Sequence, residues 1–382
     1  MKFSTFANNL LLLSFISSCS HKTIDEKLQN NLQESWKKYF SENFITNKEV
    51  EIFVITNRQM KTADFGCSDT HFGINLSAKI SSGSCKISVP KNHEVGEIPL
   101  AQQALSTAEN LSDADKKDKS QSPNEVFRIG ASSVKSLDEI IATVKKTNRT
   151  PLVFVHGFNV KYQEALLRAA QIVYDLKYQG PIILFSWPAG AEDSLFESAQ
   201  INKTYENNFN NTKKSIAEFQ NFLLALQKNK IKINLMVHSM GHQIVLPALD
   251  NIGSAVKPQI LVNQLILNAP DFSSEEFKAA AKNIKNISNH ITLYCSSNDK
   301  ALLASRSFNN NQRAGACVFA AEIDTVDVSK IDNSVLSLGH GYYSSREVLG
   351  DIFLQLIGIK TEQRLFITKG NFKGGEKFLM RD

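Results

Sequence analysis

The fold is decided by the segment INLMVHSMGHQIVLPAL at residues 233–249. Residues 233–237 are apolar at nearly every position, which predicts a strand covered by helices on both faces, and residues 243–249 predict a helix. A strand, a tight turn that carries Ser239 and a following helix form the context of a nucleophile elbow. In such an elbow the turn lifts a serine hydroxyl above the edge of the sheet, where it can attack a carbonyl.

Ser239 is therefore the candidate nucleophile. The backbone amide of Met240, at the N-terminus of the following helix, is placed to donate to an oxyanion, and Gly241 lets the helix pack close to the strand. Val237 stands where the GxSxG pattern has a glycine, and a branched side chain there is expected to strain the turn. The pentapeptide alone leaves a second interpretation open, in which Ser239 merely caps a helix.

A second strand ends in the sequence VFVHGFN at residues 153–159. A turn of this kind presents a backbone amide as the second oxyanion donor, and here that amide belongs to Phe158. His156 precedes the nucleophile and lies in a turn, so we expect it to form structural hydrogen bonds rather than act as the base. His156, Asn159 and Trp187 are candidates for the pocket, although Trp187 fits a pocket wall and a core aromatic equally well.

A serine nucleophile needs a histidine within reach, oriented by a carboxylate. The α/β-hydrolase fold places these in the chain order serine, acid, histidine, which Ser239, Asp299 and His340 satisfy. Asp271 is the rival acid, because some enzymes of this fold carry the carboxylate one strand earlier. An alternative for Asp299 is that it caps a helix over residues 301–306. Two further histidines follow the nucleophile at positions that do not suit a base: His242 and His290.

From about residue 126, apolar runs alternate with amphipathic ones, which predicts parallel βαβ units. The fold class is therefore α/β, a mostly parallel sheet with helices on both faces, after a β-rich N-terminal extension. The expected strands are 50–55, 85–89, 126–129, 151–155, 181–186, 233–237, 264–267, 291–295 and 317–323. The expected helices are 136–145, 162–176, 215–227, 243–249 and 275–284.

Five segments are expected along the chain. A lipoprotein signal peptide occupies residues 1–18, and a partly helical spacer follows over 19–48. The β-rich extension covers 49–125 and includes a polar loop at 106–124, either a flap or a disordered insertion. The hydrolase domain covers 126–360, and 361–382 form a C-terminal tail.

The first residues have the features of an export signal. Lys2 supplies a positive charge, residues 10–16 are apolar, and small residues precede Cys19. The sequence ISSC at 16–19 resembles the lipobox of bacterial lipoproteins, which makes Cys19 the expected lipidation site; the alternative is an ordinary secretion signal with an incidental cysteine. Ser20, rather than Asp, resembles the pattern of outer-membrane sorting. We expect an envelope protein anchored by acyl chains such as palmitate, on the outer membrane facing the periplasm.

Four cysteines remain beyond Cys19, in a compartment that permits disulfides. A bridge between Cys67 and Cys85 is plausible. Cys295 and Cys317 lie in apolar runs and are expected to be buried small side chains. Their spacing matches no zinc site, so no metal is expected.

Composition and charge argue against a nucleic-acid-binding function. The chain has 382 residues, a net charge of +5 and 42% hydrophobic residues, enough to bury a sizeable core. The positive charge is dispersed, and no nucleic-acid-binding signature accompanies it. We therefore expect no nucleic-acid partner; the oligomeric state stays open.

The motifs together resemble a known family, the uncharacterised bacterial α/β-hydrolases of the esterase and lipase superfamily called domain of unknown function 900. The resemblance implies that Ser239, Asp299 and His340 occupy its triad positions. Two departures are Val237, where members usually have a small residue, and Asn208, where they usually have Asp. The resemblance rests on residues 53–58, 87–90 with His93 and Gly96, 156–159, 185–188, Tyr205, Ser215, 238–241, 268–271, 293–302 and the turn at His340.

The expected function is that of a serine hydrolase, a carboxylesterase or lipase that cleaves an acyl ester through an acyl-enzyme at Ser239. The expected substrate is a small ester or a lipid, and no cofactor is needed. Thioesters and amides use the same groups, so the bond type stays open. The alternative is a non-catalytic envelope lipoprotein that uses the hydrolase scaffold for binding.

Overall fold

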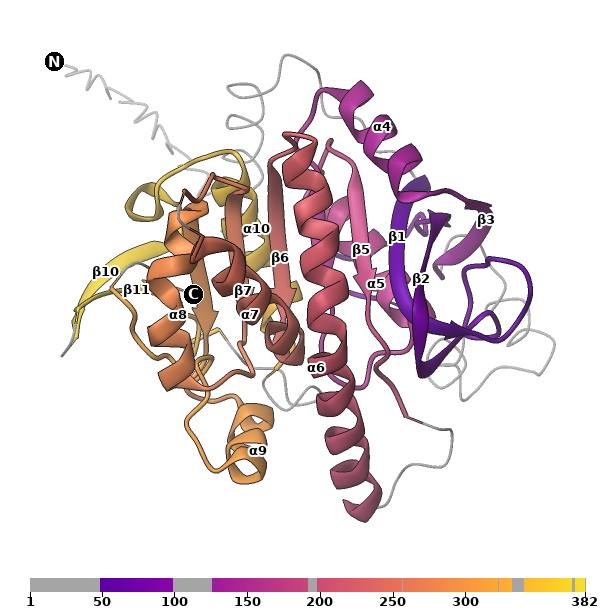
Figure 1. The fold of residues 1–382 in the computed structure, drawn as a ribbon. Helices are drawn as coiled ribbons and strands as arrows, with labels where there is room; N and C mark the ends of the chain where they lie inside the picture. The colour runs from indigo at the N-terminus through magenta and orange to yellow at the C-terminus, as the bar shows by residue number, and fades with distance from the viewer. Residues whose placement is uncertain are drawn as a thin grey trace, which may run out of the picture.

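The computed structural model describes residues 49–98, 126–191, 198–255, 257–321, 323–331, 340–372 and 375–381. The predictions for the signal peptide, Cys19, the spacer and the polar loop at 106–124 lie outside these residues. In the described part of the chain, an eleven-stranded sheet runs through the molecule with helices on both faces (Figure 1). No helix there is long and apolar enough to span a bilayer.

The middle of the sheet is parallel, and both ends are closed by antiparallel strands. The strand order is β10-β11-β9-β8-β7-β6-β4-β5-β1-β2-β3. The pairs β1–β2, β2–β3 and β10–β11 are antiparallel, and the other neighbours are parallel. The strands are β1 (Glu49–Met60), β2 (Phe72–Ser88), β3 (Arg128–Val134), β4 (Leu152–Val155), β5 (Ile182–Ser186), β6 (Ile233–His238), β7 (Val262–Asn268), β8 (Ser288–Cys295), β9 (Asp324–Asp327), β10 (Ile367–Phe372) and β11 (Gly375–Met380).

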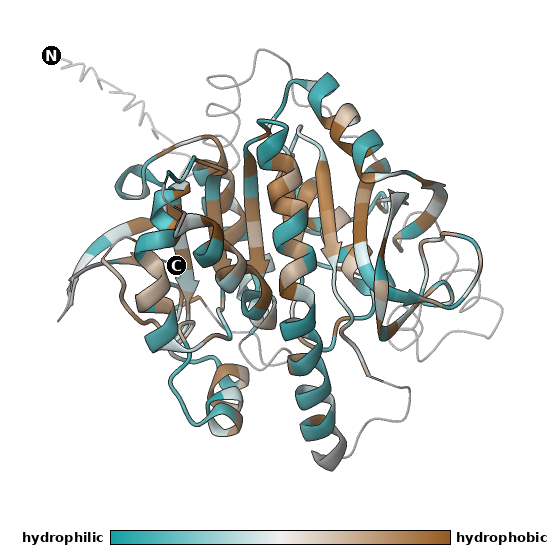
Figure 2. Ribbon diagram, in the orientation of Figure 1, coloured by the Kyte–Doolittle hydropathy of each residue, from teal (hydrophilic) through white to brown (hydrophobic). Residues whose placement is uncertain are grey.

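Two apolar layers hold the helices against the sheet. The layer on one face joins α4, α6, α7 and α8, and the layer on the other joins α5 and α10. Figure 2 shows the apolar strands between the helices and the polar outer side of α6. The helices are α4 (Leu137–Thr147), α5 (Tyr162–Asp175), α6 (Ser198–Lys228), α7 (His242–Gly253), α8 (Ser274–Asn286), α9 (Lys300–Asn309) and α10 (Arg346–Leu356).

The central strands are apolar because they contribute to both layers. Val153 of β4 packs into the layer of α4 and α6, and the next residue, Phe154, packs into the layer of α5. Both are fully buried. Burying one such side chain stabilises the fold by about 1.5–3 kcal/mol. Because these strands are packed on both faces, their ends have fixed positions. The candidate site residues lie just after those ends.

The predicted strand at 317–323 is wrong. The strand in this region is β9, which begins at Asp324, and Cys317 has a left-handed backbone with φ 60°. The run is apolar because Val318, Ala320 and Ile323 are buried, and Cys317 is bonded to Cys295. Cys295 is buried as expected, whereas Cys317 is only partly buried, and the sequence did not predict the bond between them.

The expected bridge between Cys67 and Cys85 is present, whereas the strands at both ends of the chain differ from the predictions. The expected strand at 126–129 begins at Arg128 instead, and it pairs antiparallel with β2 rather than opening the parallel run. β1 is parallel to β5, so the N-terminal strands share the sheet of the core. The predicted tail contains β10 and β11, and β11 pairs with β9.

Candidate active site

The nucleophile elbow stands at the end of β6. Ser239 begins a single 3-10 turn, Ser239–Gly241, that leads into α7. Its φ of 52° is left-handed, a conformation that non-glycine residues adopt only when their surroundings impose it. The strain therefore sits at Ser239 itself. Val237 is an ordinary residue of β6, paired with Val155 and Leu267 and buried in the core.

Two glycines are required because neighbouring atoms leave no room for a Cβ at either position. A Cβ at Gly241 would lie 2.6 Å from the carbonyl oxygen of His156, so α7 can start this close to β4 only with glycine there. A Cβ at Gly157 would lie 2.8 Å from Cβ of Ser239. The turn after β4 is thus pressed against the candidate nucleophile.

Three side chains from distant parts of the sequence meet at this edge of the sheet. His340 lies in the segment before the 3-10 turn Tyr342–Ser344, and Asp299 follows β8. Nε2 of His340 is 2.7 Å from Oγ of Ser239, and Nδ1 of His340 is 2.6 Å from Oδ2 of Asp299. With the ring neutral and its proton on Nδ1, the carboxylate accepts from Nδ1 and Nε2 accepts from the serine hydroxyl.

Asp299 has both of the uses considered for it. Oδ1 accepts a hydrogen bond from the Leu302 amide at 3.0 Å, so the residue caps α9. Oδ2 faces His340, and the side chain is almost fully buried. The cap holds the carboxylate in place without using the oxygen that faces the imidazole.

Asp271, the rival acid, is occupied elsewhere. Its Oδ1 accepts from Nε of Arg313 at 2.6 Å and from the Ser305 hydroxyl, and Oδ2 accepts from the Tyr205 hydroxyl. The ion pair and the two hydrogen bonds together join the end of β7 to α9, to α6 and to the segment after α9. Asp299, not Asp271, is the carboxylate that contacts His340.

The two expected oxyanion donors belong to turns that adjoin Ser239. The amide of Met240 follows it within the 3-10 turn, and the amide of Phe158 follows Gly157 in the turn that touches it. Asn208 fixes the second turn, because its Oδ1 accepts from the amides of Asn159 and Gly190 and its Nδ2 donates to the Gly190 carbonyl. An Asp at position 208 would lack that donor, which gives the departure from the family pattern a structural role.

His156 and Trp187 pack against each other next to the candidate site. The two rings stack with centroids 5.2 Å apart, and Nε1 of Trp187 donates to the His156 carbonyl at 2.8 Å. Trp187 is fully buried in the core, which decides between its two interpretations. Burial lowers the pKa of His156 to about 3, so the ring is neutral and acts structurally. Asn159 is exposed, with φ 56°.

Arg58 is an organising residue to which sequence reasoning assigned no role. Its guanidinium donates to Oγ of Ser186 and to the carbonyls of Gly73, Ala189 and Val160. It is fully buried, and desolvation lowers its pKa to about 9. The available signal was a cation ending the buried strand segment FVITNR, since a charge in that position needs several acceptors.

Two more histidines lie beside Ser239, the candidate nucleophile. His238 stacks on Tyr343 with ring centroids 3.9 Å apart, and Nδ1 of His242 is 2.7 Å from the Ser239 carbonyl oxygen. Burial lowers the pKa of His242 to about 3 and that of His238 well below its usual value. Neither contacts the serine hydroxyl, so His340 is the histidine placed to act on it.

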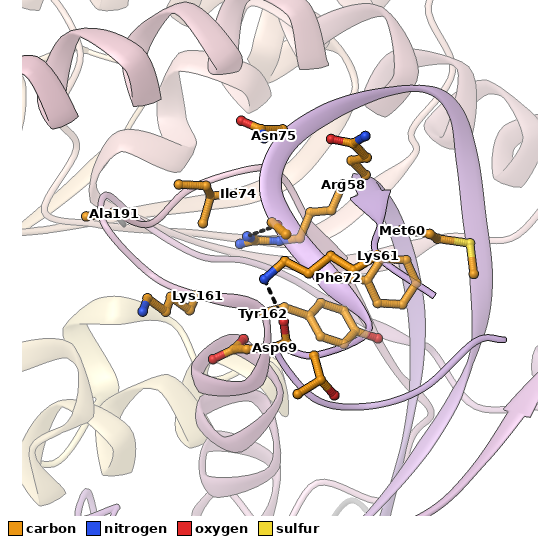
Figure 3. Close-up of a pocket in the computed structure, with 13 residues that line it drawn as sticks. Arg58, Met60, Lys61, Asp69, Phe72, Ile74, Asn75, Lys161, Tyr162 and Ala191 are labelled. Atoms are coloured by element: carbon orange, nitrogen blue, oxygen red, sulfur yellow. Dashed lines mark hydrogen bonds between the residues drawn. The ribbon is translucent and has the colours of Figure 1, made fainter. Parts of the chain in front are cut away.

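A pocket of about 230 Å³ opens beside these groups. It is lined by His340, by Gly157 and Phe158 of the turn after β4, and by side chains of α5. A larger hollow of about 690 Å³ lies between the end of β1 and the start of α5, where Lys61 donates to the carbonyl of Asp69 (Figure 3). Of the three residues, His340 lines the smaller pocket, and none of them lines the larger hollow. The smaller pocket is therefore the one that adjoins the candidate site.

One group in the described residues has the spacing of metal ligands: Cys295, Cys317 and Asp327. The two sulfurs are joined in a disulfide, so they do not offer thiolates. The group therefore acts as a crosslink at the end of β8.

Residues 132–360 match the family described as alpha/beta hydrolases of unknown function (DUF900). The chain belongs to this family. The match spans the elbow, the turn after β4, the acid loop and the turn at His340. A comparison with curated proteins gives no match.

Two solved structures show a distant likeness. One is phospholipase PlaB from Legionella pneumophila, with 11% identity and a TM-score of 0.25 over 61% of this chain and 68% of the other. The second is the same phospholipase in complex with thio-NAD, with 11% identity and a TM-score of 0.23 over 61% and 67%. At these scores the family assignment rests on the match over residues 132–360.

Proposed function

We propose that this hydrolase-family protein is a serine hydrolase that cleaves an acyl ester through an acyl-enzyme at Ser239. The observation that carries the proposal is the pair of hydrogen bonds that links Asp299, His340 and Ser239. Three residues spread over a hundred positions meet in the order and geometry that nucleophilic catalysis needs. Membership of an α/β-hydrolase family supports the same reaction class.

The first half of the reaction forms the acyl-enzyme. Oγ of Ser239 attacks the ester carbonyl carbon while its proton moves to Nε2 of His340, and Asp299 stabilises the resulting imidazolium. The carbonyl oxygen becomes an oxyanion between the amides of Phe158 and Met240. When the tetrahedral intermediate collapses, the bond to the alcohol oxygen breaks and His340 gives its proton to that oxygen.

The second half returns the enzyme to its starting state. A water molecule loses a proton to Nε2 of His340 as it attacks the acyl carbon, and the same two amides hold the new oxyanion. Collapse breaks the bond to Oγ, which recovers its proton from the imidazolium. The carboxylic acid leaves, and no group outside the chain is consumed except water.

Ester hydrolysis is tested with p-nitrophenyl esters of graded acyl length. We expect the wild type to release p-nitrophenol, with the chain-length optimum separating carboxylesterase from lipase behaviour. Ser239→Ala and His340→Ala should each lower kcat by roughly 10⁴-fold or more, because triad members act as a unit. Hydrolysis by Ser239→Ala at the wild-type rate would contradict the proposal, and inactivity of the wild type on every ester would favour a non-catalytic scaffold.

We also propose that the protein is an envelope lipoprotein anchored through Cys19, on the outer membrane facing the periplasm. The ISSC sequence at 16–19 supports it, and so do the disulfides Cys67–Cys85 and Cys295–Cys317, which suit an oxidising compartment. In cells fed labelled palmitate, we expect label on the wild type in the membrane fraction. Cys19→Ala should lose both the label and the membrane association; a labelled Cys19→Ala protein would refute the anchor.

A further inference from the structure

The pocket beside His340 carries a positive charge that the triad does not use. Among the described residues that line it, Arg168 of α5 is the one Lys or Arg side chain. We propose that Arg168 binds an anionic group, a phosphate or a carboxylate, on the alcohol part of the ester that this enzyme cleaves. The inference rests on the proposed function and adds a substrate class to it.

Arg168 is held in place by a connected set of hydrogen bonds. Its Nη1 donates to the Gly96 carbonyl at 3.1 Å and to Oε1 of Gln171 at 2.8 Å. Gln171 donates in turn to Asp175, and the same carboxylate accepts from the Gly96 amide and contacts His93. The guanidinium is therefore fixed before any ligand arrives, which lowers the entropy cost of binding.

Part of the guanidinium is left for a ligand. Within the described chain, the hydrogen bonds of Arg168 all run through Nη1, so Nε and Nη2 have no protein acceptor. These two nitrogens form one edge of the planar group, the edge that pairs with two oxygens of a phosphate or carboxylate. Because Arg168 lines the pocket, a ligand there has a guanidinium with two uncommitted donors beside it.

The guanidinium also lies close to residues that contact the reacting groups. Its central carbon lies 5.7 Å from the ring centroid of Tyr343, and Tyr343 stacks on His238, the residue before the nucleophile. His340 lines the same pocket. Because His340 hands its proton to the departing alcohol oxygen, the space beside it receives the alcohol part of the substrate.

The other charges in the pocket do not cancel this site. Glu164 lies one helical turn before Arg168 and interacts electrostatically with it, but desolvation raises the pKa of the Glu164 carboxyl, which also accepts from the backbone of Lys161. His156 and His238 are buried and neutral. An anionic group entering the pocket therefore meets one preformed cation next to the triad.

The test compares two acetate esters, phenyl acetate and 4-acetoxyphenyl phosphate, on wild type, Arg168→Gln and Arg168→Lys. The readout is the ratio of kcat/KM for the phosphate ester to that for phenyl acetate, because the intrinsic reactivity of each ester cancels between variants. We expect Arg168→Gln to lower the ratio by about tenfold, the worth of a charge-assisted hydrogen bond. Arg168→Lys should lose less, since the charge stays while the planar fork is lost.

The control variant is Arg128→Gln, which removes the same charge from an exposed position on β3. Its ratio should equal that of the wild type. A second readout is inhibition by phenyl phosphate, whose inhibition constant should rise for Arg168→Gln but not for Arg128→Gln. A ratio and an inhibition constant that do not change in Arg168→Gln would overturn the proposal.

A second set of substrates, presented as lipids, shows whether the anionic group belongs to a lipid headgroup or to a small molecule. Phosphatidylglycerol and uncharged diacylglycerol are presented in mixed micelles to the same variants. A ratio that depends on Arg168 only in micelles assigns the site to a lipid headgroup, and dependence only with the soluble esters assigns it to a small molecule. Wild type that cleaves no ester and takes up no fluorophosphonate would instead refute the proposed function, a result distinct from equal ratios in an active enzyme.

Discussion

At the scale of single residues, two buried aspartates at the ends of neighbouring strands have different surroundings. Asp299 gives one oxygen to His340 and the other to the α9 cap, while Asp271 is enclosed by Arg313, Ser305 and Tyr205. Under the proposed function, these surroundings give Asp299 a catalytic role and Asp271 a structural one. Position in the chain alone suited both.

Asp299→Asn should lower kcat by about 10²–10⁴-fold with little loss of stability. The amide oxygen can still cap α9, but the neutral side chain no longer stabilises the imidazolium or fixes its tautomer. Steady-state kinetics and urea unfolding of the same preparation measure the two effects. A wild-type kcat in this variant would show that another group orients His340.

Asp271→Asn is the matched variant, with the opposite expected result. Removing the charge leaves the Arg313 guanidinium buried and uncompensated, which costs about 3 kcal/mol in the free energy of unfolding. The kcat of the folded fraction should stay within a few-fold of wild type. If Asp271→Asn lost activity while keeping its stability, the assignment of the two aspartates would be reversed.

Gly157→Ala should damage catalysis more than folding. The new Cβ would sit 2.8 Å from Cβ of Ser239, so the turn carrying the Phe158 amide must move away from the nucleophile. A shift of this size costs about 10²-fold in kcat. Gly73→Ala is the control, because its Cβ would first meet the flexible end of Lys61. Equal kcat values for the two variants would mean that the turn has no part in the reaction.

At the scale of elements, the parallel strands were the most predictable part. β4, β5, β6, β7 and β8 lie where apolar runs predicted them, because two-sided burial demands apolar residues at almost every position. The candidate triad followed from the same logic, since parallel strands bring their carboxyl ends to one edge. Chain order named Ser239 and His340 but left Asp271 and Asp299 as candidate acids, and the structure places Asp299 against His340.

The elements that sequence reasoning missed depend on contacts between distant segments. The apolar run at 317–323 has the composition of a strand, yet the Cys295–Cys317 bond and local burial shape it. β11 pairs with β9 through Phe378 and Leu379 only. No sequence pattern within either segment predicts that pairing. Arg58 was missed as an organiser because its acceptors come from three separate segments of the chain, at Gly73, Val160 and 186–189.

The Cys295–Cys317 disulfide ties the apolar segment to the end of β8, four residues before Asp299. Replacing both cysteines with Ala should lower the free energy of unfolding by roughly 3 kcal/mol, the loop-closure value for this separation, and should lower kcat by loosening the acid loop. The same change at Cys67 and Cys85 should affect stability but not kcat. Urea unfolding measures the stability of the two double variants, and ester kinetics measure their kcat. Equal kcat values would show that the disulfide does not position the loop that carries Asp299.

At the scale of the whole molecule, N-terminal and C-terminal strands extend the hydrolase core into one continuous sheet. β1, β2 and β3 extend it beyond β5, and β9, β11 and β10 extend it beyond β8. Arg364, just before β10, pairs with buried Asp351 of α10. The last residues therefore contribute to the core, although the sequence analysis predicted only a C-terminal tail there.

Buried neutral histidines predict how stability depends on pH. The pKa values of His156 and His242 are about 3 in the folded protein, against 6.5 for an exposed ring, so the unfolded chain binds more protons between these values. Stability should thus fall as pH drops from 6.5 toward 3, by at most about 1.4 kcal/mol per pH unit for each ring. Urea unfolding of wild type and His242→Gln at about pH 7 and about pH 5 tests this. The variant should lose less stability between the two; parallel losses would argue against it.

The most direct test of the central claim, that Ser239 is a nucleophile activated by His340 and Asp299, is the site of fluorophosphonate labelling. Mass spectrometry of the labelled wild type should place one adduct on the peptide that contains Ser239. Ser239→Ala should take up no label, and His340→Ala should label far more slowly. An adduct on another residue, or equal labelling of wild type and Ser239→Ala, would contradict the account.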